Sequence, residues 1–133
     1  MQTRDGSPVS LYDTEADYTV LYFWRYDCPA CKKSTPQMKE VYEKWKERGV
    51  EIFSVCTKGA DELGECWDYV DEHGLGQWVQ AVDPYQRYYR AYDIKSTPTM
   101  FVLDRDHRIV MKNLSVEQLG DFLTQQYGNR EGK

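Results

Sequence analysis

The stretch VLYFWRYDCPAC, residues 20–31, places two cysteines three positions apart shortly after an apolar run. A strand that turns into a helix at this point would hold both sulfurs at the start of the helix. Pro29 suits the first helical position, where its fixed φ is favourable and its missing N–H is not needed, so Cys28 is the predicted N-cap. The spacing therefore predicts a dithiol at a helix N-terminus.

The two cysteines have different predicted roles. Free backbone N–H groups and the helix dipole stabilise a thiolate on Cys28, and a thiolate is the nucleophile in disulfide exchange. Cys31 lies almost one turn further along the same face, where it could resolve a mixed disulfide on Cys28. The Asp27 carboxylate opposes ionisation of Cys28, whereas Lys32 and Lys33 weakly favour it. The alternative is a structural disulfide in an inert domain.

Length and composition indicate one domain. A chain of 133 residues is close to the usual domain size, and no Pro/Gly/Ser-rich linker or repeat divides it. The formal net charge is -5 with acidic and basic residues interspersed, which argues against nucleic-acid binding. No apolar run approaches the roughly 18 residues of a membrane span, and no signal sequence follows Met1. We expect a single domain over residues 1–133, compatible with excision from a longer protein.

Apolar periodicity predicts strands that alternate with helices. Residues 18–24 and 50–56 are expected buried strands, and an i, i+3, i+4, i+7 pattern predicts a helix over 28–48 that Pro36 kinks and Gly49 ends. The other expected elements are a short edge strand at 10–12, a helix at 61–73 capped by Asp61, a strand at 78–82, a helical stretch at 83–92, an antiparallel hairpin of 99–103 with 108–111, and a last helix with a capping box of Ser115 and Gln118. This order predicts an α/β sheet with helices on both faces.

These residues resemble the thioredoxin superfamily from about Tyr18 to Tyr127. FW at 23–24, CPACK at 28–32 and Pro36 are similar to that family's active-site strand and kinked helix. STPT at 96–99 resembles its second signature, a cis-proline loop that faces the dithiol. The resemblance implies a thioredoxin-like fold with a central mixed sheet, and disulfide exchange that needs no cofactor beyond the two cysteines.

The segment from Gly59 to Arg90 is longer than thioredoxin requires at that place. It resembles the central insertion of the extracytoplasmic TlpA and ResA branch of the superfamily. This resemblance implies an extra helix and strand, a periplasmic or cell-envelope location, and reduction of disulfides in protein clients. It also implies an upstream reductant that regenerates the dithiol. We expect the domain to be a monomer.

The resemblance also implies a set of client contacts. A cis bond before Pro98 would turn the Thr97 backbone toward the dithiol and offer N–H and C=O groups to an extended client peptide. Trp24 and Tyr26 would add apolar contact beside this loop, with packing inside the protein as the alternative. Lys112 occupies the loop position before the last helix at which thioredoxin has a glycine lining the partner groove.

Two departures from the family pattern affect proton transfer. Tyr22 stands six residues before Cys28, where thioredoxin has a buried aspartate. Ser34 stands three residues after Cys31, where the extracytoplasmic branch often has a glutamate. Both usual acid–base groups are absent, so we expect disulfide exchange to survive with an altered rate and pH profile.

The remaining cysteines, Cys56 and Cys66, have three interpretations. With Cys28 and Cys31 they could form a four-cysteine zinc site, but structural zinc ligands usually come in two closely spaced pairs, and these two lie ten residues apart. We expect instead that Cys56 is a small buried side chain and that Cys66 packs the helix at 61–73. A disulfide between them requires Cα atoms within about 7 Å. No metal site is predicted.

The predicted function is disulfide exchange with protein clients in the reductase direction, and two other classes stay open. A thiol peroxidase is disfavoured, because the peroxidatic cysteine of peroxiredoxins normally follows a threonine in a Pro-rich loop, whereas RYD at 25–27 precedes Cys28. The second alternative is a binding module of a larger envelope protein, in which the domain docks a partner and its dithiol turns over little.

Overall fold

Strand β1 (Tyr18–Trp24) lies at the centre of a five-stranded sheet in the computed structural model, which describes residues 1–4, 6–58, 60–83, 85 and 87–131. Strand β1 pairs in parallel with β2 (Val50–Cys56) and antiparallel with β4 (Thr99–Leu103). At the edges, β3 (Val79–Val82) runs parallel to β2, and β5 (Ile109–Lys112) runs antiparallel to β4. The strand order is β3-β2-β1-β4-β5, and the predicted mixed sheet is confirmed.

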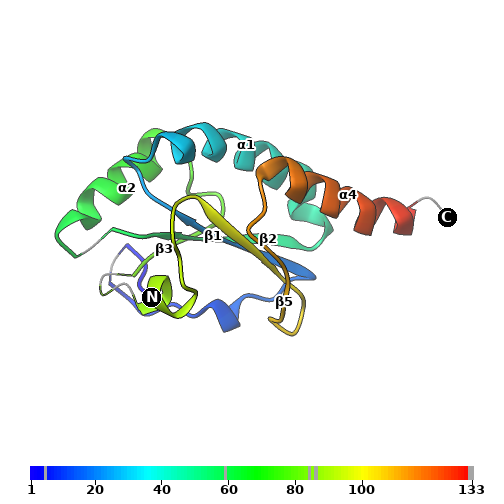
Figure 1. Cartoon of the computed structure of the whole chain (residues 1–133), viewed down its shortest axis with the longest axis horizontal. Helices are drawn as coiled ribbons and strands as arrows, with labels where there is room; N and C mark the ends of the chain where they lie inside the picture. The colour runs from blue at the N-terminus through cyan, green and yellow to red at the C-terminus, as the bar shows by residue number, and fades with distance from the viewer. Residues whose placement is uncertain (5, 59, 84, 86, 132–133) are drawn as a thin grey trace.

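Helices cover the two faces of the sheet unequally, as Figure 1 shows. The long helices α1 (Pro29–Trp45), α2 (Leu63–Glu72) and α4 (Val116–Glu131) lie on one face. The short helix α3 (Arg87–Ala91) and the 3-10 helix η1 (Leu11–Asp13) lie on the other, together with the N-terminal segment. None of the helices described is both long and apolar enough to cross a membrane.

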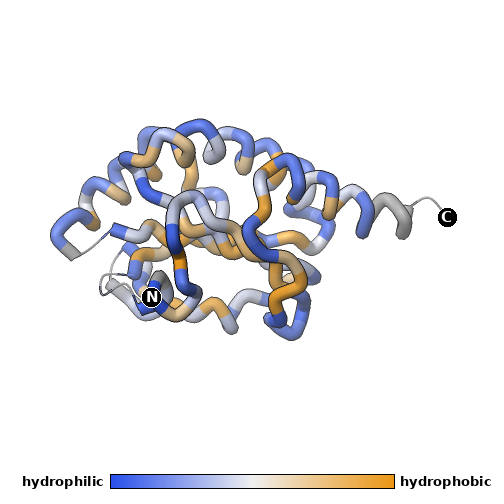
Figure 2. The backbone as a smooth tube through the Cα atoms, in the orientation of Figure 1, coloured by the Kyte–Doolittle hydropathy of each residue, from blue (hydrophilic) through white to orange (hydrophobic). Residues whose placement is uncertain are grey.

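The apolar run of β1 is buried on both sides, which explains why it has no polar alternation. Val20, Tyr22 and Trp24 pack toward the three long helices, whereas Leu21 and Phe23 pack toward η1 and α3. Figure 2 shows the hydrophobic residues gathered along the central strands, with hydrophilic residues on the outer surface of the helices. The sheet therefore holds the end of β1 rigidly between two cores, and the dithiol follows directly from it.

The predicted edge strand at 10–12 is wrong. Ser10 instead caps η1, because its hydroxyl accepts a hydrogen bond from the backbone N–H of Tyr12 at 3.2 Å. The edge beyond β3 is extended by Gln2, whose backbone exchanges hydrogen bonds with Val82. A local side-chain bond thus prevents this segment from joining the sheet.

The helix predicted over 28–48 is α1 followed by a 3-10 turn, η2 (Lys46–Arg48). Gly49 ends it with φ of 94°, in the left-handed region that favours glycine. A Cβ atom at Gly49 would also lie 2.7 Å from Asp17 Oδ2, so a larger residue would in addition require the Asp17 side chain to move.

The inserted segment differs from its predicted boundaries. Asp61 does not cap the helix, since it lies in the 3-10 turn η3 (Ala60–Glu62) and α2 begins after Glu62. Trp78 precedes β3 and donates its indole N–H to Ser54 Oγ at 2.7 Å. Of the helical stretch predicted at 83–92, residues 87–91 form α3, and Pro84 lies outside the described residues.

The hairpin and the last capping box are confirmed. Strands β4 and β5 pair antiparallel, with β5 shifted one residue from its predicted start. Ser115 Oγ accepts from the backbone N–H of Gln118 at 3.1 Å, and Gln118 Oε1 accepts from the N–H of Ser115 at 2.9 Å. These reciprocal bonds fix the start of α4.

Cys56 and Cys66 form a disulfide that joins the end of β2 to α2, with Cα atoms 6.5 Å apart. The expectation of two separate buried thiols is therefore wrong, although both residues are buried as expected. The four-cysteine zinc hypothesis also fails, because two of its four thiolates are consumed by the disulfide. The bridge ties the inserted helix to the sheet close to the dithiol.

We predict that Cys56→Ala/Cys66→Ala lowers the free energy of unfolding by about 2 to 3 kcal/mol, since a bridge over so short a loop removes that much denatured-state entropy. Urea unfolding of the double variant and the oxidised wild type measures the difference. Reduced wild-type protein is the matched control, and we expect it to lose a similar amount. An unchanged urea midpoint in both would contradict a stabilising role for the disulfide.

Candidate active site

Cys28 caps helix α1 as predicted. Its φ and ψ of -95° and 118° are extended, and its Sγ accepts a hydrogen bond from the backbone N–H of Cys31 at 3.2 Å. Pro29 is the first helical residue, and the N–H of Lys32 closes the first helical turn on the Cys28 carbonyl at 3.0 Å. The Cys28 sulfur therefore lies over the positive end of a 17-residue helix.

The second predicted motif lies opposite this sulfur. The Thr97–Pro98 peptide bond is cis, as expected, and the Cys28 thiol donates a hydrogen bond to the Thr97 carbonyl at 3.3 Å. Cys28 and Thr97, 69 positions apart in the sequence, thus meet where β1 ends and β4 begins. Thr97 and Pro98 are half-buried, so their backbone borders the surface beside Cys28.

The two thiols differ in their tendency to ionise. Burial acts to raise the pKa of Cys28, but hydrogen bonds from the Cys31 and Thr97 side chains and from the amides of Cys31 and Ala30 outweigh it, so this pKa lies below that of an ordinary thiol. Burial, followed by the neighbouring Cys28 sulfur, raises the pKa of Cys31 to about 12. Cys28 is the better nucleophile near neutral pH, because its thiolate is far more populated than that of Cys31.

Tyr22 and Ser34 belong to a group of hydroxyls beside Cys31. The Tyr22 hydroxyl and Ser34 Oγ share a hydrogen bond of 2.6 Å, and Thr35 Oγ1 lies 3.3 Å from the same Tyr22 oxygen. Thr35 Oγ1 also donates to the Cys31 carbonyl at 2.7 Å. Burial raises the pKa of Tyr22 to about 12, so this phenol is neutral at physiological pH. Tyr22 and Ser34, the two residues that depart from the family pattern, therefore belong with Thr35 to one hydrogen-bonded network of hydroxyls beside Cys31.

Of the aromatic residues predicted to contact clients, Trp24 is buried in the core, whereas the Tyr26 hydroxyl bonds acidic side chains. Trp24 is only 1% exposed and packs 5.5 Å from the Tyr69 ring, so it supports the site from within the core. The Tyr26 hydroxyl donates to Glu62 Oε1 at 2.9 Å and also contacts Glu65.

Lys112 is the last residue of β5 rather than a loop residue, which corrects the sequence expectation. It nevertheless lines a surface hollow together with Ser96 and Thr99, the two residues that flank the cis peptide. The neighbouring Asn113 begins the loop and donates its N–H to the Met100 carbonyl at 2.8 Å.

An ion pair next to Cys28 was not anticipated from the sequence. Lys58 Nζ lies 2.7 Å from Asp27 Oδ2 and 3.4 Å from Glu62 Oε2. Parallel strands bring their carboxyl ends to one edge of the sheet, and β1 and β2 both end here. The position of Lys58 two residues after β2 was therefore the signal that could have placed it beside Asp27.

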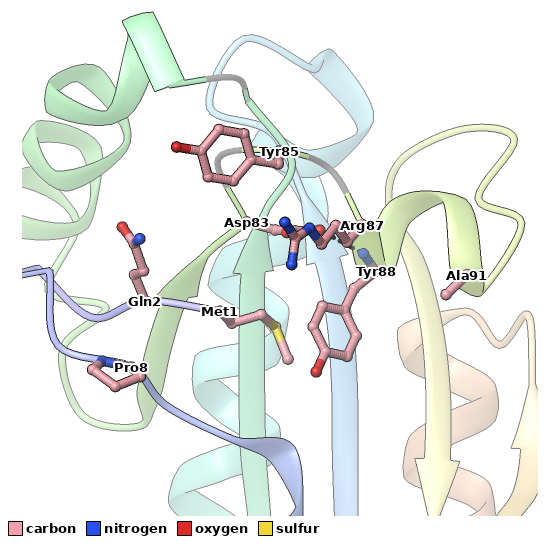
Figure 3. A pocket seen from close by; sticks show the side chains of 8 residues that line it. All are labelled: Met1, Gln2, Pro8, Asp83, Tyr85, Arg87, Tyr88 and Ala91. Carbon is pink, nitrogen blue, oxygen red and sulfur yellow. Dashed lines mark hydrogen bonds between the residues drawn. The ribbon is translucent and has the colours of Figure 1, made fainter.

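A separate pocket lies beside the carboxyl end of β3 (Figure 3), lined by Met1, Gln2, Pro8, Asp83, Tyr85, Arg87, Tyr88 and Ala91. The buried Asp83 carboxylate accepts a hydrogen bond from the Tyr88 N–H at 2.7 Å, which caps the start of α3. Because the lining includes neither cysteine nor the cis-proline loop, the chemistry does not lie in this pocket.

We predict that Cys28 of the reduced protein reacts with iodoacetamide at least about tenfold faster than Cys31 near neutral pH, because its thiolate is far more populated. The Cys28 rate should level off below the pH at which an ordinary thiol ionises, whereas the Cys31 rate should still be rising well above it. Peptide mapping after timed alkylation measures both rates. A faster reaction at Cys31 would reverse the assignment.

Proteins with a similar sequence or structure include thiol-disulfide oxidoreductases, the activity that this arrangement of cysteines indicates. The model of the AhpC/TSA family matches residues 1–112. The thiol-disulfide oxidoreductase ResA of Bacillus thuringiensis is 31% identical over 122 residues, which cover 90% of this chain and 69% of that protein.

Two solved structures are similar over nearly the whole chain. A domain of a possible thiol-disulfide isomerase from Cytophaga hutchinsonii has a TM-score of 0.85 and 30% identity, covering 100% of this chain and 90% of the other. The thioredoxin domain of a thiol-disulfide oxidoreductase from Bacteroides vulgatus has a TM-score of 0.78 and 26% identity, covering 92% and 87%. With its dithiol at the helix start, the chain therefore belongs to the AhpC/TSA family of thioredoxin-like proteins and is a thiol-disulfide oxidoreductase.

Proposed function

We propose that the protein reduces disulfides in client proteins, with Cys28 as the nucleophile and Cys31 as the resolving thiol. One observation carries this proposal: the Cys28 sulfur caps α1 and faces the Thr97 carbonyl across the cis-proline loop. A thiolate held there is activated by the helix N-terminus and is adjacent to backbone groups that can pair with an extended chain.

The proposed reaction has two exchange steps. The Cys28 thiolate attacks one sulfur of the client disulfide, forms a mixed disulfide and releases the other client sulfur as a thiolate. The Cys31 thiolate then attacks Cys28 Sγ, which forms the Cys28–Cys31 disulfide and releases the second client thiol. The client gains two electrons, and a dithiol reductant upstream must return two electrons to Cys28 and Cys31.

The client-binding surface in this proposal surrounds the cis peptide. The N–H and C=O groups of Thr97 pair with the client backbone, and Pro98 holds them toward Cys28. Tyr26 and Lys112 add client contacts beside this strip in the proposal, while Trp24 supports the site from the core. The location of Lys112 on the hollow shared with Ser96 and Thr99 supports its inclusion.

We further propose that residues 1–133 act as a single monomeric domain in the periplasm or cell envelope. The continuous five-stranded sheet, with one core on each face, supports a single domain. The Cys56–Cys66 disulfide supports an oxidising compartment, because structural disulfides persist in extracytoplasmic spaces and are rare in the cytosol.

Turnover and trapping test the function together. With dithiothreitol as reductant, we expect the wild type to accelerate insulin reduction and to consume peroxide no faster than the Cys28→Ser variant. Cys31→Ser should accumulate a mixed disulfide with insulin, and the matched Cys28→Ser variant should not. Peroxide consumption that depends on Cys28, without insulin reduction, would indicate a thiol peroxidase. Client binding without disulfide turnover would indicate a binding module.

The hydroxyl network predicts a pH-dependent resolving step. Burial keeps the pKa of Cys31 above that of an ordinary thiol, and no carboxylate contacts the hydroxyls of Tyr22, Ser34 and Thr35 in the described structure. The thiolate of Cys31 therefore becomes more populated as pH rises, and we expect resolution to accelerate by up to about tenfold per pH unit between about pH 6 and 9.

Stopped-flow decay of a Cys28 mixed disulfide measures this rate. Ser34→Glu should flatten the profile by supplying a general base, whereas the matched Ser34→Gln variant, similar in size but uncharged, should not. A flat profile in the wild type would show that another group already accepts the proton.

A further inference from the structure

Asp27 immediately precedes Cys28, the cysteine that must ionise. A carboxylate turned toward the Cys28 sulfur would disfavour its ionisation, because one anion disfavours the formation of a second one nearby. The Asp27 carboxylate lies 2.7 Å from Lys58 Nζ and 3.3 Å from Arg25 Nε. The second contact is the longer one, and the buried Arg25 Nε makes no hydrogen bond there.

Lys58 is unusually well shielded for a lysine, with its side chain only 10% exposed. Asp27, Glu62 and the Tyr26 ring surround the ammonium, which lies 5.3 Å from the centre of that ring. A buried ammonium requires such partners, because an unpaired one would lose its hydration without compensation. The Asp27–Lys58 contact is therefore the stronger of the two ion pairs that Asp27 makes.

The backbone holds Lys58 in place relative to Cys28. The neighbouring residue Thr57 donates its N–H to the Trp24 carbonyl at 2.9 Å, which joins the end of β2 to the end of β1. The Cys56–Cys66 disulfide closes the segment that carries Lys58 and Glu62. The backbone that carries Lys58 is thus fixed by the Thr57 hydrogen bond on one side and by the disulfide on the other.

We propose that Lys58 is a positioning residue for the exchange reaction: by pairing with Asp27, it keeps that carboxylate from suppressing ionisation of Cys28. The proposal rests on the role of Cys28 as nucleophile in the proposed function. It explains how an aspartate is tolerated immediately before the reactive cysteine. The reciprocal effects agree with the geometry, since the Lys58 contact lowers the pKa of Asp27 and the Asp27 contact raises the pKa of Lys58.

Apart from Arg25, the other ionisable or charged groups around Cys28 in the described residues do not pair with Asp27. Glu62 and Glu65 share the Tyr26 hydroxyl, and Glu62 also contacts Lys58. Lys32 and Lys33 are exposed on α1, where solvent screens them. The thiol that shares the site is Cys31, which stays protonated near neutral pH.

The test follows ionisation of Cys28 directly by ultraviolet thiolate absorbance and by the pH dependence of its alkylation in the reduced protein. We expect Lys58→Met to move both profiles to higher pH and to slow alkylation near pH 6 by about threefold. This net effect combines a smaller population of Cys28 thiolate with a slightly greater nucleophilicity of each thiolate. The exposed Lys33→Met is the matched control and should change this rate by less than about twofold.

A double-mutant cycle distinguishes action through Asp27 from a direct effect of the Lys58 charge. Asp27→Asn alone should move the profile by much less than Lys58→Met does, because Lys58 already offsets the carboxylate, and Lys58→Met should have a much smaller effect in the Asp27→Asn background than in the wild type. Equal effects of Lys58→Met in both backgrounds would overturn the proposal.

Asp27→Asn changes a half-exposed side chain, so it provides a test even if Lys58→Met does not fold. A shift of this variant's profile to lower pH by more than about one unit would show that Asp27 suppresses ionisation despite Lys58, and would also overturn the proposal. Failure of insulin reduction with these shifts intact would count against the proposed function alone.

Discussion

The hydrogen bond from the Cys31 N–H to Cys28 Sγ is the interaction on which the site depends. It makes Cys28 the N-cap of α1, so the direction of the helix and the exposure of the sulfur are set together. Pro29 makes this arrangement favourable because its ring suits the first helical position. The buried strand β1 fixes where the helix begins, and the cis-proline loop meets the sulfur from the other side.

The sequence predicted most of this arrangement because each part has a local signal. The apolar run of β1, the proline after Cys28 and the capping box at Ser115 act within a few residues of one another. The errors at the active site fall where contacts between separate elements decide. Nothing near Cys56 shows that its partner is Cys66, and the Lys58–Asp27 pair depends on two strands that end at the same edge of the sheet. At Ser10, the hydrogen bond that caps a 3-10 helix outweighs a weak strand pattern in the sequence.

Charge is arranged differently around the two cysteines. Beside Cys31 lie the hydroxyls of Tyr22, Ser34 and Thr35, and in the described part of the chain no carboxylate contacts them to accept a proton. On the other side, a shielded lysine compensates the aspartate beside Cys28. These two features act on different steps: the first limits resolution of the mixed disulfide, and the second preserves the initial attack.

The equilibrium between dithiol and disulfide at Cys28 and Cys31 tests the central claim most directly. The protein would be equilibrated in dithiothreitol or glutathione buffers of graded potential, trapped by alkylation and mapped by mass spectrometry. We predict one reversible two-electron transition assigned to Cys28–Cys31, within the range of about -270 to -120 mV known for such domains. A Cys28–Cys31 pair that forms no disulfide in oxidising buffer, or that stays oxidised in all reducing ones, would contradict a redox function.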